Sequence, residues 1–274
     1  MKLVNQTDVL DAALGYEESV RFLARTGFDG VDLSLMGMLR EDDVWCREDY
    51  REHARALREL ADREGVEFLQ AHAPFPSSRG DREFDEMAFG RIVRAMEIAA
   101  IVGAPRIVVH PLIHMPYRKN REKLMDLSVE FYRRLIPYCE TFGIRVCTEN
   151  MWERDPNRKV ITMSLCADPA EFRELLERVD SPWIGGCLDI GHCGLVGVDP
   201  ADAVRTLGKE HLDALHVHDV DYFRDCHTMP FLENLDWDSI AAALKEVGYR
   251  GEFTIETHGL IKKMPAPRGP PAFS

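Results

Sequence analysis

The 274-residue sequence lacks several features that mark other classes of protein. It has no apolar run approaching about 18 residues, the length of a membrane-spanning helix, so we expect no membrane span. Its first residues, MKLVNQTDVLD, have neither the basic region nor the apolar stretch of a secretion signal. The seven cysteines include no C-x-x-C pair, and an odd, scattered set is typical of a reducing compartment. These absences predict a cytoplasmic protein.

Basic residues are scarce relative to acidic ones. The chain has 34 Lys and Arg against 47 Asp and Glu, a formal net charge of −13 at pH 7. Nucleic acids and anionic membranes bind basic faces, so this balance disfavours both as partners, although it says little about one local groove. No P-loop or other phosphate cradle is recognisable, so the sequence leaves open whether a substrate carries phosphate.

The sequence does contain a repeated alternation of short apolar runs and longer amphipathic segments. The expected strands are residues 2–6, 30–35, 66–73, 106–111, 145–150, 185–190, 212–219 and 251–257. The expected helices are residues 16–26, 47–64, 85–103, 119–142, 168–179, 199–208 and 237–248. Eight strands alternating with helices predict an α/β protein with a parallel sheet closed into a (β/α)8 TIM barrel. A doubly wound open sheet is the alternative, disfavoured because no G-x-G-x-x-G follows the first strand.

We expect one barrel domain over residues 1–258 and a proline-rich tail over residues 259–274, since no linker divides the rest. Four prolines lie between residues 265 and 271. Proline breaks helices, so the eighth outer helix is expected to be missing. The seam between the last and first strands would then be covered by the extended tail, another helix or a neighbouring subunit, which hints at a homo-oligomer.

Acidic and imidazole side chains end six consecutive expected strands. Alternate residues of a strand face opposite ways, and the apolar parity can pack on helices, so the other parity points into the barrel. The last inward residues are His72, His110, Glu149, Asp189, His218 and Glu256. Barrel active sites lie at this end, and crowded carboxylates and imidazoles need a cation to offset their repulsion and desolvation. The sequence therefore predicts a divalent metal site, and oxygen and imidazole ligands suit Mn, Co, Mg or Zn.

Each residue alone also has a structural interpretation. A single His at a strand end is usually a hydrogen-bonded structural residue, and a lone carboxylate there usually caps the next helix. His216, deeper than His218, is expected to be structural or to support a ligand, and Cys147 and Cys187 to be small core residues. His258 is expected to be a surface or loop residue. These interpretations explain the residues singly but not the set of six.

The strings HAPFP, VVHP, CTEN, LDIGH, HVHDVDYFRDCH and TIET resemble the xylose isomerase-like barrel superfamily up to about residue 258. That superfamily includes sugar phosphate isomerase/epimerases, ketose 3-epimerases and endonuclease IV-type nucleases. Resemblance to the ketose 3-epimerases implies one metal held by Glu149, Asp189, His218 and Glu256. It implies substrate contacts from His192 and Arg224, and from Asp155 where those enzymes have Glu; His72 and His110 are further candidates for substrate binding.

The implied chemistry is isomerisation or epimerisation of a keto sugar or related polyol through an enediolate, with manganese, cobalt or magnesium. A metal on the carbonyl and hydroxyl oxygens acidifies the adjacent C–H. Glu149 and Glu256 are the expected acid and base. If they act on opposite faces of the enediolate, the reaction is an epimerisation, whereas a single base that moves a proton between neighbouring carbons gives isomerisation. Related barrels eliminate water or a leaving group through the same enolate, so an inosose dehydratase or lyase also stays open.

An endonuclease IV-like phosphodiesterase acting on abasic DNA is the alternative function. Those enzymes use nine ligands for three zinc ions, and all nine residue types are present here. Beyond the four implied metal ligands they are His72, His110, His192, Asp225 and His227, which form a possible additional metal site. Loops rich in Arg and aromatic residues, which would grasp DNA, are not evident, so a small carbohydrate is the expected partner. A non-catalytic barrel that only binds a carbohydrate is the third hypothesis.

Two loops near the expected mouth, residues 75–84 and 151–167, carry Arg79, Trp152 and Arg158. These side chains either close over a substrate or form solvated surface.

Overall fold

The computed structural model describes residues 1–262 and shows a closed barrel of eight parallel strands. Around the barrel the order is β1-β10-β9-β8-β5-β4-β3-β2. The strands are β1 (Leu3–Gln6), β2 (Gly30–Ser34), β3 (Glu67–His72), β4 (Arg106–Val108), β5 (Arg145–Glu149), β8 (Ile184–Asp189), β9 (Leu212–Val217) and β10 (Phe253–Ile255). The predicted TIM barrel is thus confirmed, and the open-sheet alternative is wrong.

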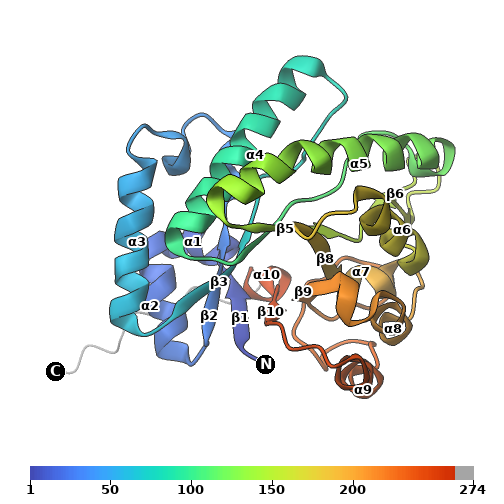
Figure 1. The fold of residues 1–274 in the computed structure, drawn as a ribbon. Coiled ribbons are helices and arrows are strands. Elements are labelled where there is room, and N and C mark those ends of the chain that lie inside the picture. The colour runs from blue at the N-terminus through green and yellow to red at the C-terminus, as the bar shows by residue number, and fades with distance from the viewer. Residues whose placement is uncertain (263–274) are drawn as a thin grey trace.

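Seven long helices surround the strands, one after each of the first seven (Figure 1). They are α2 (Tyr16–Thr26), α3 (Tyr50–Glu64), α4 (Arg82–Val102), α5 (Tyr117–Phe142), α6 (Pro169–Val179), α8 (Pro200–His211) and α9 (Trp237–Val247). Apolar residues at three- and four-residue spacing produce one buried face on each, such as Ala54, Leu57 and Ala61 on α3. Glycines in left-handed conformation end α3, α4, α5 and α9, as their positions in the sequence predict.

Short elements fill the loops that follow the strands. They are α1 (Asp8–Leu14), the 3-10 helices η1 (Met36–Leu39) and η2 (Val44–Cys46), α7 (Ile190–Leu195), and an antiparallel hairpin of β6 (Trp152–Arg154) and β7 (Ile161–Met163). None of them was predicted, because three to seven residues are too few for a periodic pattern to emerge. They all follow the carboxyl ends of strands and therefore shape the mouth of the barrel.

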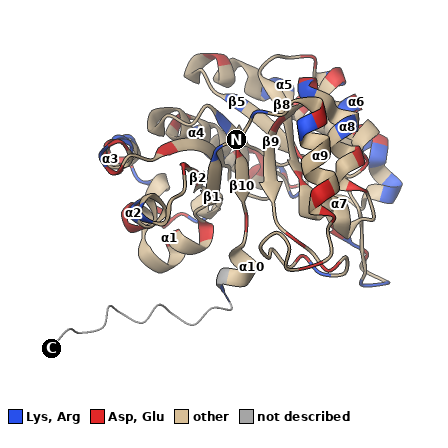
Figure 2. Cartoon of the chain, turned by 90° about the horizontal axis from the view of Figure 1, so that it is seen from below, with Lys and Arg blue, Asp and Glu red and all other residues tan. Residues whose placement is uncertain are grey.

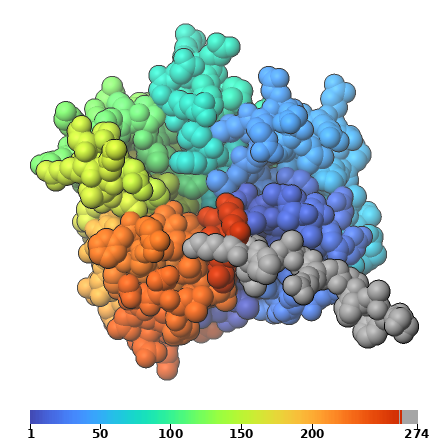
Figure 3. Space-filling view, turned by 180° about the vertical axis from the view of Figure 1, so that it is seen from behind, coloured from blue at the N-terminus to red at the C-terminus, as the bar shows by residue number. Residues whose placement is uncertain are grey.

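The seam between β10 and β1 has no full outer helix among the described residues. After β10 the described residues form only the short helix α10 (His258–Ile261), which spans the predicted domain boundary at residue 258. This helix lies near the middle of the face shown in Figure 3. Outside the barrel, an apolar groove of about 370 Å³ runs between Met1, Phe231, Trp237 and Phe253. Coverage of this seam by the tail or by another subunit stays a prediction, since residues 263–274 lie outside the described part.

The core has two parts. Most of it packs between the strands and the outer helices, whereas a small cluster of Val108, Cys147, Cys187 and Ala214 fills the barrel interior. This places the two cysteines in the core as predicted, below the polar strand ends. Lys and Arg alternate with Asp and Glu on the outer helices, for example around α8 (Figure 2). Within residues 1–262, none of the helices combines the length and apolar character needed to cross a membrane.

Candidate active site

The six strand-end residues predicted from the sequence lie together at the carboxyl end of the barrel. All six are at least nine-tenths buried. His110 Nε2 lies 3.3 Å from His72 Nε2 and 3.3 Å from Glu149 Oε2. Across the mouth, His218 Nε2 lies 3.0 Å from Asp189 Oδ1. The alternation of side chains along parallel strands thus produces one continuous polar cluster.

The turn after β8 holds Asp189 in place. Its Oδ1 caps α7 by accepting the backbone N–H of His192 at 2.7 Å. Asn150, at the end of β5, exchanges two hydrogen bonds with the Asp189 backbone, at 2.7 and 2.9 Å. Gly191 is required by close approach, because a Cβ there would overlap the ring of His218. These contacts leave Asp189 Oδ2 free to face His218 at 3.2 Å from its Nε2.

His216 lies between the two carboxylates expected to act as acid and base. Its Nδ1 is 3.3 Å from Glu149 Oε2 and 3.5 Å from Glu256 Oε1. On the other side of the ring, His216 Nε2 lies 2.9 Å from Gln70 Nε2, whose amide also donates to Asp32 at 3.0 Å. The side chain is completely buried, in keeping with the supporting role predicted for it.

The pKa values of the carboxylates shift in opposite directions. Burial alone would raise the pKa of Glu149, but the imidazoles of His216 and His110 outweigh it and hold that pKa well below its usual range. Burial and the nearby charge of Glu149 raise the pKa of Glu256 well above its usual range, against the effect of His216. Burial opposes a charge on His192, yet Asp189 and Glu149 raise its pKa to about 10.

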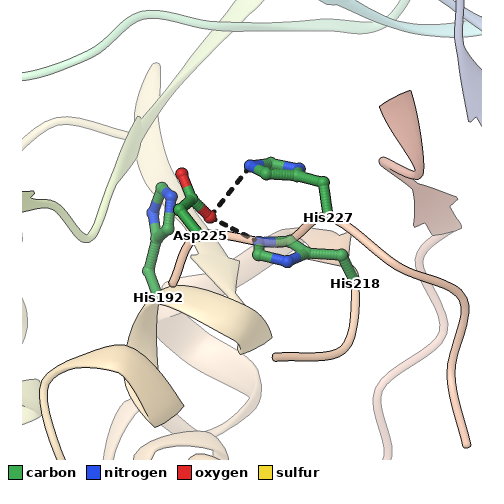
Figure 4. Close-up of side chains that lie close together, drawn as sticks. All are labelled: His192, His218, Asp225 and His227. Atoms are coloured by element: carbon green, nitrogen blue, oxygen red, sulfur yellow. Dashed lines mark ion pairs between the residues drawn. The ribbon is translucent and has the colours of Figure 1, made fainter. Parts of the chain in front are cut away.

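A second group of potential ligands lies beside Asp189 and comes mostly from the loop after β9 (Figure 4). Asp225 Oδ1 is 3.1 Å from His227 Nε2 and 4.0 Å from His218 Nε2. The rings of His218 and His227 stack with centroids 3.8 Å apart. His192 faces Asp225 from the other side (Figure 4). Burial opposes the charge of Asp225, but His227 and the other imidazoles hold its pKa below its usual range.

These donors fit a divalent metal. In each of four overlapping groups the donor atoms lie within 4.8 Å of one another: His72, His110, Glu149; Glu149, Asp189, His192; His192, His218, Asp225, His227; and Asp32, His72, His216, Glu256. Among the described residues, Glu149 Oε2 and Asp225 Oδ1 are buried and lie near imidazole nitrogens, but neither accepts a well-aligned hydrogen bond. Buried carboxylate oxygens without such bonds are costly unless a cation neutralises them, and the mixture of oxygen and imidazole suits a transition metal or magnesium.

Residues 20–270 match the family described as the xylose isomerase-like TIM barrel. The chain belongs to the xylose isomerase-like TIM barrel family. This confirms the resemblance drawn from the short sequence strings.

Two relatives of this barrel are themselves uncharacterized proteins. MJ1311 of Methanocaldococcus jannaschii is 29% identical over 211 residues, which cover 74% of this chain and 69% of the relative. The protein y4fM of Sinorhizobium fredii is 25% identical over 165 residues, and the match covers 59% of this chain but only half of that protein's length. Neither name carries an activity.

Solved structures share the same architecture at low identity. A D-tagatose 3-epimerase-like protein has a TM-score of 0.75 at 24% identity, covering 94% of this chain and 91% of that one. A D-psicose 3-epimerase with D-fructose scores 0.73 at 16% identity, with 93% and 84% covered. The IolI protein with a bound zinc atom scores 0.73 at 19% identity, with 94% and 89% covered. Likeness at these identities shows the fold.

The barrel encloses a cavity of about 430 Å³ at this cluster, within the range of about 300–1,000 Å³ usual for small-molecule sites. Besides the predicted residues, Gln6, Phe75, Met151 and His258 line it. Gln6 Nε2 donates to Glu256 Oε1 at 2.7 Å. The strand-end rule, applied to the weak first strand, would have found Gln6.

The structure shows which of the loop residues named above line the cavity. His258 was expected to be a surface or loop residue. It instead begins α10, where its half-buried ring packs on His227 with centroids 3.8 Å apart and lines the cavity. Trp152, at the start of the β6–β7 hairpin, also lines the cavity, whereas Arg79 and Arg158 do not. No local pattern distinguishes these outcomes, because they depend on how each loop folds back over the mouth.

Two residues predicted to contact substrate do not line the cavity. Asp155 is half-buried in the turn of the hairpin, where its carboxylate accepts the backbone N–H groups of Asn157 and Arg158 at 2.8 Å each. The Arg224 side chain is 75% exposed, and its Nε donates to Asp221 at 2.7 Å. A nearby partner in each loop holds the side chain outside, so substrate contact by Asp155 and Arg224 stays a prediction without structural support.

Proposed function

We propose that this barrel is a metal-dependent isomerase or epimerase of a keto sugar or related polyol that acts through an enediolate. The observation that carries the proposal is the arrangement of Glu149 and Glu256, whose carboxylates come from β5 and β10 and meet at one nitrogen of His216. They border a cavity of monosaccharide size. Solved barrels of the same fold include a D-psicose 3-epimerase and a 3-keto-D-glucoside 4-epimerase from E. coli, which supports sugar chemistry.

Glu149, Asp189, His218 and Glu256 would hold the metal. A divalent cation held there would supply Lewis-acid chemistry, which would acidify the C–H next to the carbonyl of the sugar. Glu149 removes that proton from one face and Glu256 supplies a proton at the other, which inverts the carbon. Trp152 excludes water from the cavity, while His72 and His110 hydrogen-bond the sugar hydroxyls.

Deuterium incorporation tests this proposal. The protein is incubated in D2O with Mn²⁺ and D-fructose, D-tagatose or D-psicose, and the products are analysed by NMR. We expect one solvent deuteron at the inverted carbon for each turnover, whereas a dehydratase or lyase would release an elimination product instead. Products without deuterium at that carbon would exclude an enediolate that exchanges its proton with solvent.

Variants of the two carboxylates test their roles. Glu149→Gln and Glu256→Gln are each expected to lower kcat by about a thousandfold, the typical contribution of a general acid or base. The far-UV circular dichroism should stay unchanged, because the amides preserve the shape of the side chains. The matched control is Glu59→Gln on the exposed face of α3, where activity should persist. Full activity in either site variant would contradict the mechanism.

A phosphodiesterase of the endonuclease IV type is the second candidate. The overlapping donor groups favour it, because all nine of the expected zinc ligands lie in one cluster. Metal content separates the two functions. About one manganese, cobalt or magnesium ion per chain favours the sugar enzyme, whereas two or three zinc ions together with cleavage of an abasic duplex favour the nuclease.

A further inference from the structure

A second cavity adjoins the proposed active-site cavity. It measures about 410 Å³ and lies between α1, the end of β2 and the two 3-10 helices. Asp8 and Met36 line both cavities, so the two meet there. In Figure 3 the N-terminal segments that form it, in blue, border α10 in red. We call this cavity the acidic annex; its other polar lining residues are Asp11, Tyr16, Ser34, Arg40, Asp42 and Asp43.

The annex carries a negative charge. Four aspartates line it against one cation, Arg40, whose guanidinium lies 3.6 Å from Asp43 and 3.7 Å from Asp42. Among the described residues that line the adjoining cavity, the one Lys or Arg is the exposed Lys262. A phosphate dianion placed in the annex would therefore be repelled by the surrounding carboxylates.

Polar groups in the annex lack protein partners. Ser34 is only 5% exposed, and its hydroxyl has no hydrogen-bond partner among residues 1–262. Asp11 Oδ1 is likewise buried and unpartnered, whereas Asp11 Oδ2 accepts the hydroxyl of Thr7. The Ser34 hydroxyl lines the annex, so a ligand hydroxyl there would supply the partner that it lacks.

The carboxylate of Asp43 is fixed in position. Asp43 is 7% exposed and accepts the backbone N–H of Trp45 at 3.0 Å. Gly37 packs so closely that a Cβ there would overlap the same carboxylate. The part of the annex wall formed by Asp43 is therefore preorganised, as in a binding site.

We infer that the acidic annex binds a neutral glycosyl unit attached to the reacting keto sugar, so that the substrate is an unphosphorylated keto disaccharide or a similar glycoside. The inference rests on the proposed function and deepens it. Fixed carboxylates accept hydrogen bonds from sugar hydroxyls, and the Ser34 hydroxyl donates or accepts one. The annex and the active-site cavity are also nearly equal in volume, which suits one sugar ring in each.

Calorimetric titration of the full chain with Mn²⁺ present tests the inference. The probes are turanose, maltulose and isomaltulose, which carry a glucosyl unit at different positions of fructose, with D-fructose and fructose 6-phosphate for comparison. We expect at least one disaccharide to bind about tenfold more tightly than D-fructose, the value of one or two added hydrogen bonds, and fructose 6-phosphate to bind most weakly.

Two variants assign the preference to the annex. Ser34→Ala and Asp11→Asn are each expected to reduce the preference for the disaccharide over D-fructose to within about threefold. The first removes a partner for a sugar hydroxyl, and the second replaces a carboxylate of the annex wall by an amide, which is a weaker acceptor. Asp62→Asn, the same change at an exposed position on α3, should leave the preference intact.

The possible failures are distinguishable. If no disaccharide is preferred over D-fructose, if fructose 6-phosphate binds best, or if the preference survives in both annex variants, the annex inference is wrong. The proposed function would still stand if D-fructose or another ketose exchanged deuterium. If no sugar binds or exchanges, the proposed function fails and the inference fails with it.

Discussion

Neutral side chains position the charged groups of this site. Asn150 joins the ends of β5 and β8 through its two hydrogen bonds to the Asp189 backbone, and Gln6 donates to Glu256. Both amides are buried, so their bonds do not compete with solvent and restrict the rotamers of the acids they support. The distance between potential ligands is thus determined by amides that bear no charge themselves.

At the residue scale, Asp11 should make the stability of the protein depend on pH. Burial, with smaller effects of Asp8 and Glu17, raises the pKa of Asp11 to about 7 from an ordinary 3.8. The folded state therefore binds this proton more tightly than the unfolded state, and its contribution to stability is complete below about pH 4 and lost as the pH rises to about 7.

Asp11→Asn should remove this loss. Relative to the natural protein, the variant is expected to gain roughly 4 kcal/mol in the free energy of unfolding between about pH 4 and about pH 8. Urea unfolding at the two pH values measures the gain, with the exposed Asp62→Asn variant as the control. An equal difference between variant and natural protein at both pH values would mean that Asp11 titrates normally.

At the element scale, the short helix α7 positions two of the candidate metal ligands. All six of its residues are buried, and its N-terminus is capped by the candidate ligand Asp189. Because Gly191 leaves space for the His218 ring, the position of this helix also determines the position of a second candidate ligand. A six-residue helix with no periodic pattern therefore affects two ligands at once.

Gly191→Ala should lower metal affinity. The added methyl group overlaps the His218 ring, so either the ring or α7 must move, and we expect Mn²⁺ binding to weaken by about tenfold to a hundredfold. Competition with a fluorescent chelator measures the affinity, and circular dichroism checks the fold.

Gly90→Ala is the matched control for this change. Gly90 lies inside α4, and a Cβ there meets nothing within 4 Å, so metal affinity should stay unchanged while helix propensity adds up to about 1 kcal/mol of stability. Equal metal affinity in both variants would show that His218 does not depend on the space left by Gly191.

At the scale of the whole molecule, the barrel brings together carboxylates from distant parts of the chain. Seven of the ten histidines surround Glu149, Asp189, Asp225 and Glu256: they are His72, His110, His192, His216, His218, His227 and His258. Closing the barrel requires the carboxylates to leave water together, which costs free energy that a bound cation would offset.

Removal of metal should therefore destabilise the fold. Dialysis against EDTA is expected to lower Tm by several degrees, since a ligand that binds the folded state stabilises it by mass action, and added Mn²⁺ should restore the original value. Differential scanning calorimetry measures both changes. An unchanged Tm, together with no metal in the purified protein, would contradict a metal site in this cluster.

Much of this architecture could be predicted from the sequence. Seven outer helices, eight strands and the six strand-end residues follow from periods of 3.6 and 2, and parallel strands in one barrel necessarily bring their carboxyl ends to the same side. That rule also covers Gln6, which the faint pattern of the first strand concealed. A closed barrel thus converts a local alternation of residues into a common site.

Only the tertiary structure decided which loop residues join that site. His258 lines the cavity, whereas Asp155 and Arg224 lie outside it because their side chains bind backbone N–H groups and Asp221 within their own loops. The annex likewise exists only because α1 packs near the loop after β2. Loop conformation depends on contacts between residues distant in sequence and on competition among nearby polar partners, neither of which leaves a periodic trace in the sequence.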